Sequence, residues 1–527
     1  MKITAPVVLV LAVSLFAGCA NSTVAPHVLR LSDGTGDYTL DPYFATDQES
    51  FDLAALTMAS LVRWDDGSES FRPEMLTVLP SRANGGVSRD FRHIVLHLRP
   101  NMRWSDGAPL TSRDVVFTAH AVTDPGGGAI FRDGWNDLRS IKALDATTVQ
   151  METISTDANF LHRRLFGYMR FILPEHLLAG VALNHSSYNR MPVGAGPFRY
   201  VRVDPGTAIV LEANPTYFRA PPKLHRIVVR ILPDANTTLV QMRTGDLDMI
   251  ANLSAEADSA ARALTNVRIA GLSTYATVRV VFNRDSPTVG DQRVREALRY
   301  ATDRRTIAAK VYHGIGAIFE ALFVPEDAMH AELHFVEYDP ARAARALERA
   351  GWRPGPDGVR MKGGTRLTFS LIAPSKDLRL DAAIEIMRAD WAKIGAAVQV
   401  QRIPFQEMLV PDGRVARGHF DAVIIPYGTA SMWFDNQWGC AEFPPRGLNL
   451  ARFCDRGVEE RVALLRRTDD RVARARIFSE IQRIIDQRVP MIILVQPPNL
   501  YVFGPRVRGV HMNPWSIFER FSEADAP

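Results

Sequence analysis

Hydrophobic residues recur along this chain with two different spacings, and segments of each kind alternate. Ile94, Leu96 and Leu98 are two residues apart, which is typical of a strand that buries one face. The same reasoning predicts further strands at Ile227 to Ile231, at Val398 to Val400 and at the buried run Val423 to Ile425. Segments between them space their apolar residues three and four apart, as helices do. This alternation of strands and helices predicts an α/β protein.

The ends of two helices can be placed from local capping chemistry. Thr111 can cap a helix through its hydroxyl, and Asp114 lies in the first turn, where a carboxylate meets the helix dipole favourably. Asp339 and Pro340 are expected to begin a second helix, which Gly351 ends. Three more helices are predicted from their apolar faces: Val294, Ala297, Leu298 and Ala301; Ala383, Met387, Trp391 and Ile394; and Ile477, Ile481 and Ile484.

The order of residues in several segments resembles the signature of one protein family. Arg103 to Thr118, RWSDGAPLTSRDVVFT, is similar to the family signature DGTPLTAEDVVFT. Val193 to Pro197, VGAGP, resembles the family's GTGPY loop. Further similar segments run from Asn214 to Ile227, Leu239 to Ile250, Val281 to Ile307, Tyr338 to Gly351 and Asn449 to Pro490. On these motifs the chain is identified as a member of the family 5 extracytoplasmic solute-binding proteins, which capture ligands for dipeptide, oligopeptide and nickel ABC importers.

The resemblance implies a fold with two lobes and a hinge between them, of the periplasmic-binding-protein type (type II, cluster C-like). Residues 19–272 are expected to form the N-terminal part of lobe I, including the family's extra subdomain. Residues 273–488 would form lobe II, and residues 489–527 would return to lobe I. A ligand that contacts both lobes favours the closed form by the difference between its affinities for the closed and open forms. The resemblance implies that closure then signals to the permease.

The first residues have the layout of a signal peptide. Residues 1–18 contain one Lys followed by a short apolar core and small residues, and Cys19 comes directly after them. Small residues before a Cys resemble a bacterial lipobox, so we expect cleavage before Cys19 and diacylation of its sulfur. An ordinary secretory signal is the alternative. A transmembrane anchor is not favoured, because the apolar run is shorter than a membrane-spanning helix needs. The protein is therefore expected to be periplasmic and anchored to a membrane as a lipoprotein.

Two further cysteines, Cys440 and Cys454, form an even pair once Cys19 is assigned to lipid. They lie in a stretch that contains Pro and Gly and reads as loop. An exported compartment permits a disulfide between them. Two free buried thiols remain the alternative. A zinc site is not expected, because only these cysteines are available and no histidines cluster near them in the sequence.

The stretch from Asp421 to Cys440 carries the best candidates for ligand contact, because polar and aromatic residues follow a buried strand at its carboxyl end. Peptide-binding relatives have a GWxxDY motif there, whose Asp pairs with the α-ammonium of the peptide. When Tyr427-Gly428 is laid on GW, Ser431 falls at the position of that Asp, and the nearest carboxylate is Asp435. This departure leaves the usual ammonium anchor in doubt.

Aromatic residues supply the remaining ligand candidates. Trp433 and Trp438 can face a ligand or, equally, belong to the core of the lobe. Tyr43 and Phe44 follow Leu40-Asp41-Pro42 and resemble the N-terminal segment that lines the family's cleft.

Charge and motif content argue against other classes of function. The formal net charge is +4 and the basic residues are dispersed, so nucleic acid is not an expected partner. No nucleophile elbow, P-loop or HExxH motif occurs, and His330 and His334 are expected on a solvated helix face rather than at a metal. The chain is therefore not expected to be an enzyme, and no catalytic residue, cofactor or metal ligand is assigned.

The expected function is that of a substrate-binding lipoprotein, a monomer, which captures a peptide or peptide-like solute between two lobes. Its partners would be this ligand, the membrane and the permease and ATPase subunits of an ABC importer. A binding or chaperone module of the same fold that serves no transporter is one alternative. A receptor for a non-peptide solute, such as a sugar, an opine or a metal chelate, is another.

Overall fold

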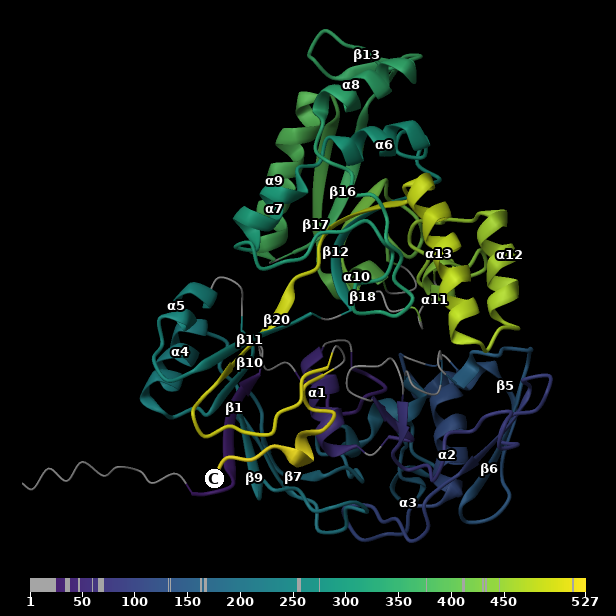
Figure 1. Ribbon diagram of the computed structural model, residues 1–527, viewed down its shortest axis with the longest axis vertical. Coiled ribbons are helices and arrows are strands. Elements are labelled where there is room, and N and C mark those ends of the chain that lie inside the picture. Colours follow the sequence, from purple (N-terminus) through teal and green to yellow (C-terminus); the bar gives the residue numbers. More distant parts are fainter. Residues whose placement is uncertain are drawn as a thin grey trace, which may run out of the picture.

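The protein has two lobes, each built on its own central sheet, in the computed structural model (Figure 1). The structure describes residues 25–33, 38–45, 48–58, 60–64, 71–130, 132, 134–161, 164, 168–253, 257–273, 275–375, 377–409, 413–428, 431, 434–444, 446–513 and 516–527. The predicted signal peptide and Cys19 lie outside these residues. No helix in the described part of the chain is long and apolar enough to cross a membrane.

The sheet of lobe I has seven strands in the order β11-β20-β10-β1-β9-β8-β7. Its strands are β1 (Val28–Asp33), β7 (Phe198–Asp204), β8 (Ala208–Ala213), β9 (Arg226–Arg230), β10 (Met249–Leu253), β11 (Arg268–Ser273) and β20 (Pro498–Phe503). Strand β1 runs parallel to both of its neighbours, β9 and β10, whereas the other pairs are antiparallel. Helices α1 (Gln48–Thr57), α4 (Ala235–Thr244) and α5 (Asp258–Arg262) accompany it. The carboxyl ends of β1 and β10 therefore lie together.

A subdomain of lobe I is built on a small antiparallel sheet in the order β4-β6-β5. Its strands are β4 (His93–His97), β5 (Leu138–Ala143) and β6 (Thr148–Thr153), and α2 (Ser112–Thr123) packs against β5 and β6. The predicted cap is confirmed: the Thr111 side chain accepts a hydrogen bond from a first-turn N–H, and the Asp114 carboxylate accepts one from the Thr111 N–H. The strands β2 (Val62–Trp64) and β3 (Phe71–Pro73) and helix α3 (Glu175–Leu178) complete this region.

Lobe II is built on a five-stranded sheet in the order β17-β16-β18-β12-β19. Its strands are β12 (Ala276–Phe282), β16 (Thr368–Pro374), β17 (Ala397–Ile403), β18 (Ala422–Gly428) and β19 (Met491–Val495). Its helices are α6 (Gln292–Tyr300), α7 (Arg304–Val311), α8 (Pro340–Arg349), α9 (Leu378–Lys393), α10 (Phe405–Leu409), α11 (Phe434–Trp438), α12 (Arg456–Leu465) and α13 (Arg471–Arg488). A small sheet of β13 (Arg353–Pro354), β14 (Arg360–Lys362) and β15 (Thr365–Arg366) extends it.

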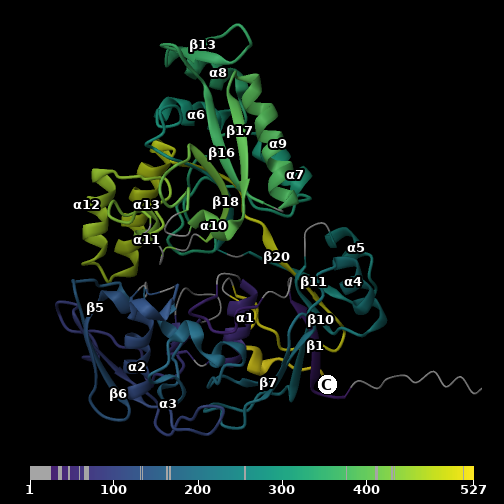
Figure 2. The same cartoon turned by 180° about the vertical axis from the view of Figure 1, so that it is seen from behind.

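Each face of the lobe II sheet is covered by its own group of helices (Figure 1, and from behind in Figure 2). Alternate residues of β12 divide between the two faces: Val280 belongs to the cluster that contains α6, α8 and α9, and Val281 to the cluster that contains α12 and α13. Burial of both faces explains why β18 and β19 begin with or consist of continuous apolar runs in the sequence, whereas the edge strand β17 alternates.

The chain crosses between the lobes from Ser273 at the end of β11 to Ala276 at the start of β12, and again from Val495 to Pro498. The expected return to lobe I at residue 489 is wrong, because β19 (Met491–Val495) pairs with β12 in the sheet of lobe II. A short apolar strand looks the same in the sequence whichever sheet it joins. The strand that returns to lobe I is β20, which pairs with β10 and β11.

Candidate functional site

The two lobes contact each other near the crossings through the start of β12 and the loop that follows α7. The Tyr275 ring packs edge-on against Trp64, with ring centroids 6.2 Å apart. Val324 is fully buried in the same lobe I cluster, and Phe319 packs against clusters of both lobes. Phe319 and Val324 therefore sit at the lobe boundary, although they belong to lobe II by sequence.

A second contact joins the lobes at the C-terminal end of α12, above the small sheet of lobe I (Figure 1). The backbone N–H of Ala158 donates to the carbonyl of Arg466 at 2.8 Å, and the Asn159 amide donates to the carbonyl of Leu465. An ion pair of 2.7 Å between Arg82 and Asp469 lies beside them. The last carbonyls of a helix lack hydrogen-bond partners within the helix. Here N–H groups of lobe I donate to such carbonyls at the end of α12 in lobe II.

The first polar residues of the candidate site lie where β12 begins and β18 ends, because Ala276 pairs with Gly428. Tyr427 is half-buried, and its hydroxyl donates to the carbonyl of Leu448 at 3.1 Å. The guanidinium of Arg279 lies 5.1 Å from the centre of the Tyr427 ring and donates to the Thr277 hydroxyl at 2.7 Å. Burial lowers the pKa of Arg279 to about 10, which leaves it charged at neutral pH.

Ser431, the residue at the expected anchor position, contacts a carboxylate that sequence reasoning missed. Its backbone N–H donates to Oδ2 of Asp327 at 2.7 Å, and only 3% of Asp327 is exposed. The two residues are 104 positions apart, and the pair Glu326-Asp327 after a proline reads as an ordinary turn. No local signal in the sequence could have joined them. Trp433 lies outside the described residues.

Asp435 and Trp438 both lie on α11, which buries them. Asp435 is 8% exposed, and its Oδ2 lies 3.7 Å from a guanidinium nitrogen of Arg466. Trp438 is 4% exposed and packs edge-on against Phe453, with ring centroids 5.9 Å apart. Of the two alternatives open for Trp438, the structure thus favours the core of the lobe, and its contact with a ligand stays a prediction.

Tyr43 is part of the lobe I core. It is 1% exposed, its hydroxyl donates to the Phe171 carbonyl at 2.6 Å, and it accepts the indole N–H of Trp135 at 3.1 Å. Phe44 is partly buried against the same cluster. The described contacts give both residues a packing role, so the expectation that they touch a ligand stays a prediction.

A buried acidic group at the carboxyl ends of β1 and β10 is a further candidate that the sequence did not point to. Asn252, at the end of β10, donates to Asp33, at the end of β1, at 2.6 Å. Ser516 donates to Asp52 at 2.6 Å, and desolvation raises the pKa of Asp52 to about 7. Carboxyl ends of parallel strands are common ligand positions in α/β proteins. Topology alone would have suggested this location once the sheet order was known.

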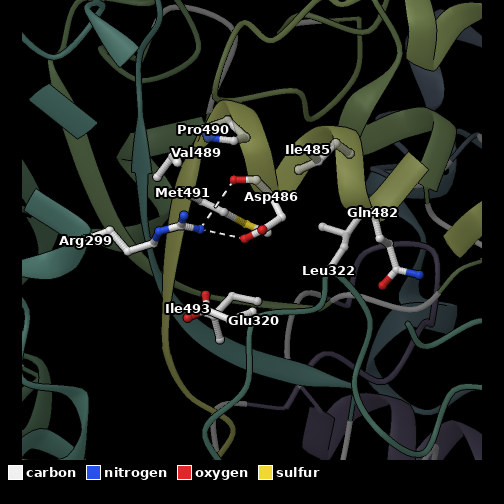
Figure 3. Close-up of a pocket in the computed structure, with 10 residues that line it drawn as sticks. All are labelled: Arg299, Glu320, Leu322, Gln482, Ile485, Asp486, Val489, Pro490, Met491 and Ile493. Carbon is white, nitrogen blue, oxygen red and sulfur yellow. Dashed lines mark hydrogen bonds and ion pairs between the residues drawn. The ribbon is translucent and has the colours of Figure 1, made fainter. Parts of the chain in front are cut away.

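Two small cavities lie within the lobes rather than between them. One, of about 10 Å³, lies beside the partly buried ion pair of Arg299 and Asp486 in lobe II (Figure 3). The other, of about 20 Å³, lies in lobe I near Glu74 and Arg170. Volumes of this size hold about one water molecule and cannot hold a solute.

His330 and His334 do not share a helix face, so that expectation is wrong. The chain from 331 to 339 has no helix, and the ring of His330 is hydrogen-bonded to the carbonyl of Phe323 at 2.8 Å. The guanidinium of Arg304 donates to the Val336 carbonyl at 2.9 Å, and Glu320 accepts the Val336 N–H at 2.7 Å. These contacts hold the segment extended.

The comparisons with known proteins identify the class. Residues 77–440 match the family described as "Bacterial extracellular solute-binding proteins, family 5 Middle", and the chain belongs to that family. It is a family 5 solute-binding protein of the ABC importer type, with the two-lobed α/β fold of these proteins, and not an enzyme.

Individual relatives extend along most of the chain. The "Oligopeptide-binding protein AppA" of Bacillus subtilis (strain 168) is 25% identical over 500 residues, 91% of this chain and 88% of that protein. The "Nickel-binding periplasmic protein" of Escherichia coli (strain K12) is 27% identical over 404 residues, 73% of this chain and 74% of that protein. The structure of AppA from Bacillus subtilis in complex with a nonapeptide matches 95% of this chain and 99% of that chain, with a TM-score of 0.80 and 22% identity.

Cys440 and Cys454 are joined by a disulfide, with their Cα atoms 4.7 Å apart. The bond ties the end of α11 to the start of α12, where Glu459 also accepts the Cys440 N–H at 3.0 Å. It therefore restrains the segment that follows Ser431.

We expect Cys440→Ser combined with Cys454→Ser to lower the free energy of unfolding by about 2–3 kcal/mol, because the bond restricts the unfolded chain by closing a loop with a sequence separation of 14. Denaturant unfolding under non-reducing conditions measures this, with reduced wild-type protein as the matched control. Equal stability of variant and oxidised wild type, or alkylation of both thiols in exported protein, would contradict the disulfide.

Proposed function

We propose that this protein captures a peptide or peptide-like solute between its lobes and delivers it to the permease of an ABC importer, acting as a monomer. The observation that carries the proposal is the arrangement of two lobes joined by two crossings, with polar groups of both lobes hydrogen-bonded to each other where the lobes meet. The similarity to oligopeptide-binding and dipeptide-binding proteins over most of the chain supports the peptide.

The hydrogen bonds between Asn159, Ala158 and the end of α12 form only when the lobes meet at that place. A closed form that they stabilise binds ligand with contacts from both lobes, so the same bonds add to the ligand affinity. Closure then needs no chemistry at the site. It needs a solute whose contacts favour the closed form.

Native mass spectrometry of protein purified without unfolding tests the identity of the solute. The proposal predicts a bound mass that fragments as a short peptide, because buried solutes often survive purification when the closed form is stable. A sugar or an opine would overturn the peptide part of the proposal. A nickel chelate would favour the second candidate function, a receptor for a metal chelate. The similarity to a nickel-binding relative supports that candidate.

Asn159→Ala is expected to weaken ligand binding about threefold to tenfold, because one hydrogen bond to α12 is worth about 1 kcal/mol. Arg82→Gln is the matched control at the same contact: its ion pair with Asp469 is about half exposed and should change affinity less than about twofold. Calorimetry with the co-purified solute measures both. An unchanged affinity in Asn159→Ala at unchanged melting temperature would remove α12 from the closure mechanism.

We also propose that Cys19 is lipidated and anchors the protein to a membrane, on the strength of the residues around it. Cys19→Ser should block lipidation and leave an unprocessed or unanchored precursor. Metabolic labelling with a palmitate analogue measures the difference. Equal label on wild type and variant would contradict the anchor and favour an ordinary secretory signal.

A further inference from the structure

We propose that Asp327 is the carboxylate that receives the positive charge of the ligand, and that this contact makes lobe closure depend on a protonated amine. The inference rests on the proposed function and names the residue that would select the ligand. It also assigns to a loop of lobe II the role that the sequence pattern would give to residue 431.

The described contacts of Asp327 are with backbone N–H groups. Its Oδ1 accepts the N–H of Met329 at 2.8 Å, and its Oδ2 accepts the N–H of Ser431 at 2.7 Å. Only 3% of the residue is exposed. Among the described residues, no Lys, Arg or His side chain forms an ion pair with it. Two N–H bonds offset part of the cost of burying a carboxylate, but within the described part of the chain its charge has no partner of opposite sign.

Other buried carboxylates of lobe II do have such partners. Glu320 pairs with Arg304, and Asp390 lies 2.8 Å from the ammonium of Lys393. Asp435, the carboxylate that the sequence offered as a substitute anchor, lies 3.7 Å from a guanidinium nitrogen of Arg466. Asp327 is therefore better suited than Asp435 to a cation that arrives with the ligand.

The place of Asp327 in the fold links its burial to closure. Val324, in the same loop, is fully buried in the lobe I cluster that also contains Tyr275. Opening the lobes would withdraw Val324, three residues before Asp327, from that cluster. Closure without a ligand therefore buries an unpaired charge, whereas closure on a protonated amine buries a pair.

The contact with Ser431 explains how the chain manages without an Asp at that position. A carboxylate on residue 431 would lie within a few ångströms of its own backbone N–H, and the Asp327 carboxylate accepts that N–H. The charge is thus supplied from a segment far away in the sequence. The ligand class that fits is a solute with a free primary ammonium, such as a peptide with an unblocked amino terminus.

The test compares a randomised tripeptide library with free amino termini and the same library after N-acetylation, by competition binding to full-length exported protein. Wild type should prefer the free-amine library at least about tenfold, since a buried charge is left unpaired when the amine is blocked. Asp327→Asn keeps the shape of the side chain and should reduce this preference below about threefold. Glu326→Gln is the matched control next to it and should retain the preference.

A second variant distinguishes recognition from a structural role. Asp327→Asn combined with Ser431→Asp should regain the preference for free amines, because it returns a carboxylate to the same place. Loss of the preference without rescue, in a protein that melts below wild type, would make Asp327 structural and overturn the inference. A preference that survives Asp327→Asn would overturn the inference and leave the proposed function standing. Binding of neither library by wild type would overturn both.

Discussion

Two short crossings of the chain join the sheets of lobe I and lobe II in the described part of the protein, and the rest of the arrangement depends on them. They lie side by side, because Ser273 pairs with Pro498 on one side of the boundary and Val278 pairs with Val495 on the other. Each lobe keeps its own buried clusters around its own sheet. The lobes can therefore rotate about two adjacent strands while their cores stay packed, which is how hinged proteins absorb large motions.

The contacts far from the crossings are of a kind that can form and break repeatedly. At the end of α12 they are single hydrogen bonds and an exposed ion pair rather than a shared core. Each contributes about 1 kcal/mol or less, so together they bias closure without locking it. Nearer the crossings, Val324 and Tyr275 bury apolar surface against lobe I. A receptor that must release its solute needs this balance, because ligand binding has to determine whether the open or the closed form is populated.

Local patterns predicted five of the longer helices, α2, α6, α8, α9 and α13, whereas contacts between distant segments could not be predicted. Thr111 with Asp114, and Asp339 before Pro340, place helix starts because the cap and the helix are neighbours in sequence. The sheet to which Met491–Val495 belongs depends on a partner strand more than 200 residues earlier, and nothing in its apolar run specifies one. The contact of Asp327 with Ser431 has the same non-local origin, as has the burial of Tyr43. The sequence thus pointed to the stretch around Ser431, but it could not point to Asp327, which contacts Ser431 from a distant segment.

Closure of the two lobes around a solute is the central claim, and a distance between the lobes tests it most directly. Leu144 in lobe I and Val472 in lobe II are 56% and 70% exposed, so spin labels on cysteines placed there should leave both cores intact. Pulsed electron resonance would give the distance distribution between the labels with and without the co-purified solute. The account predicts a shorter and narrower distribution when the solute is bound. A distribution that is the same in both states would contradict it.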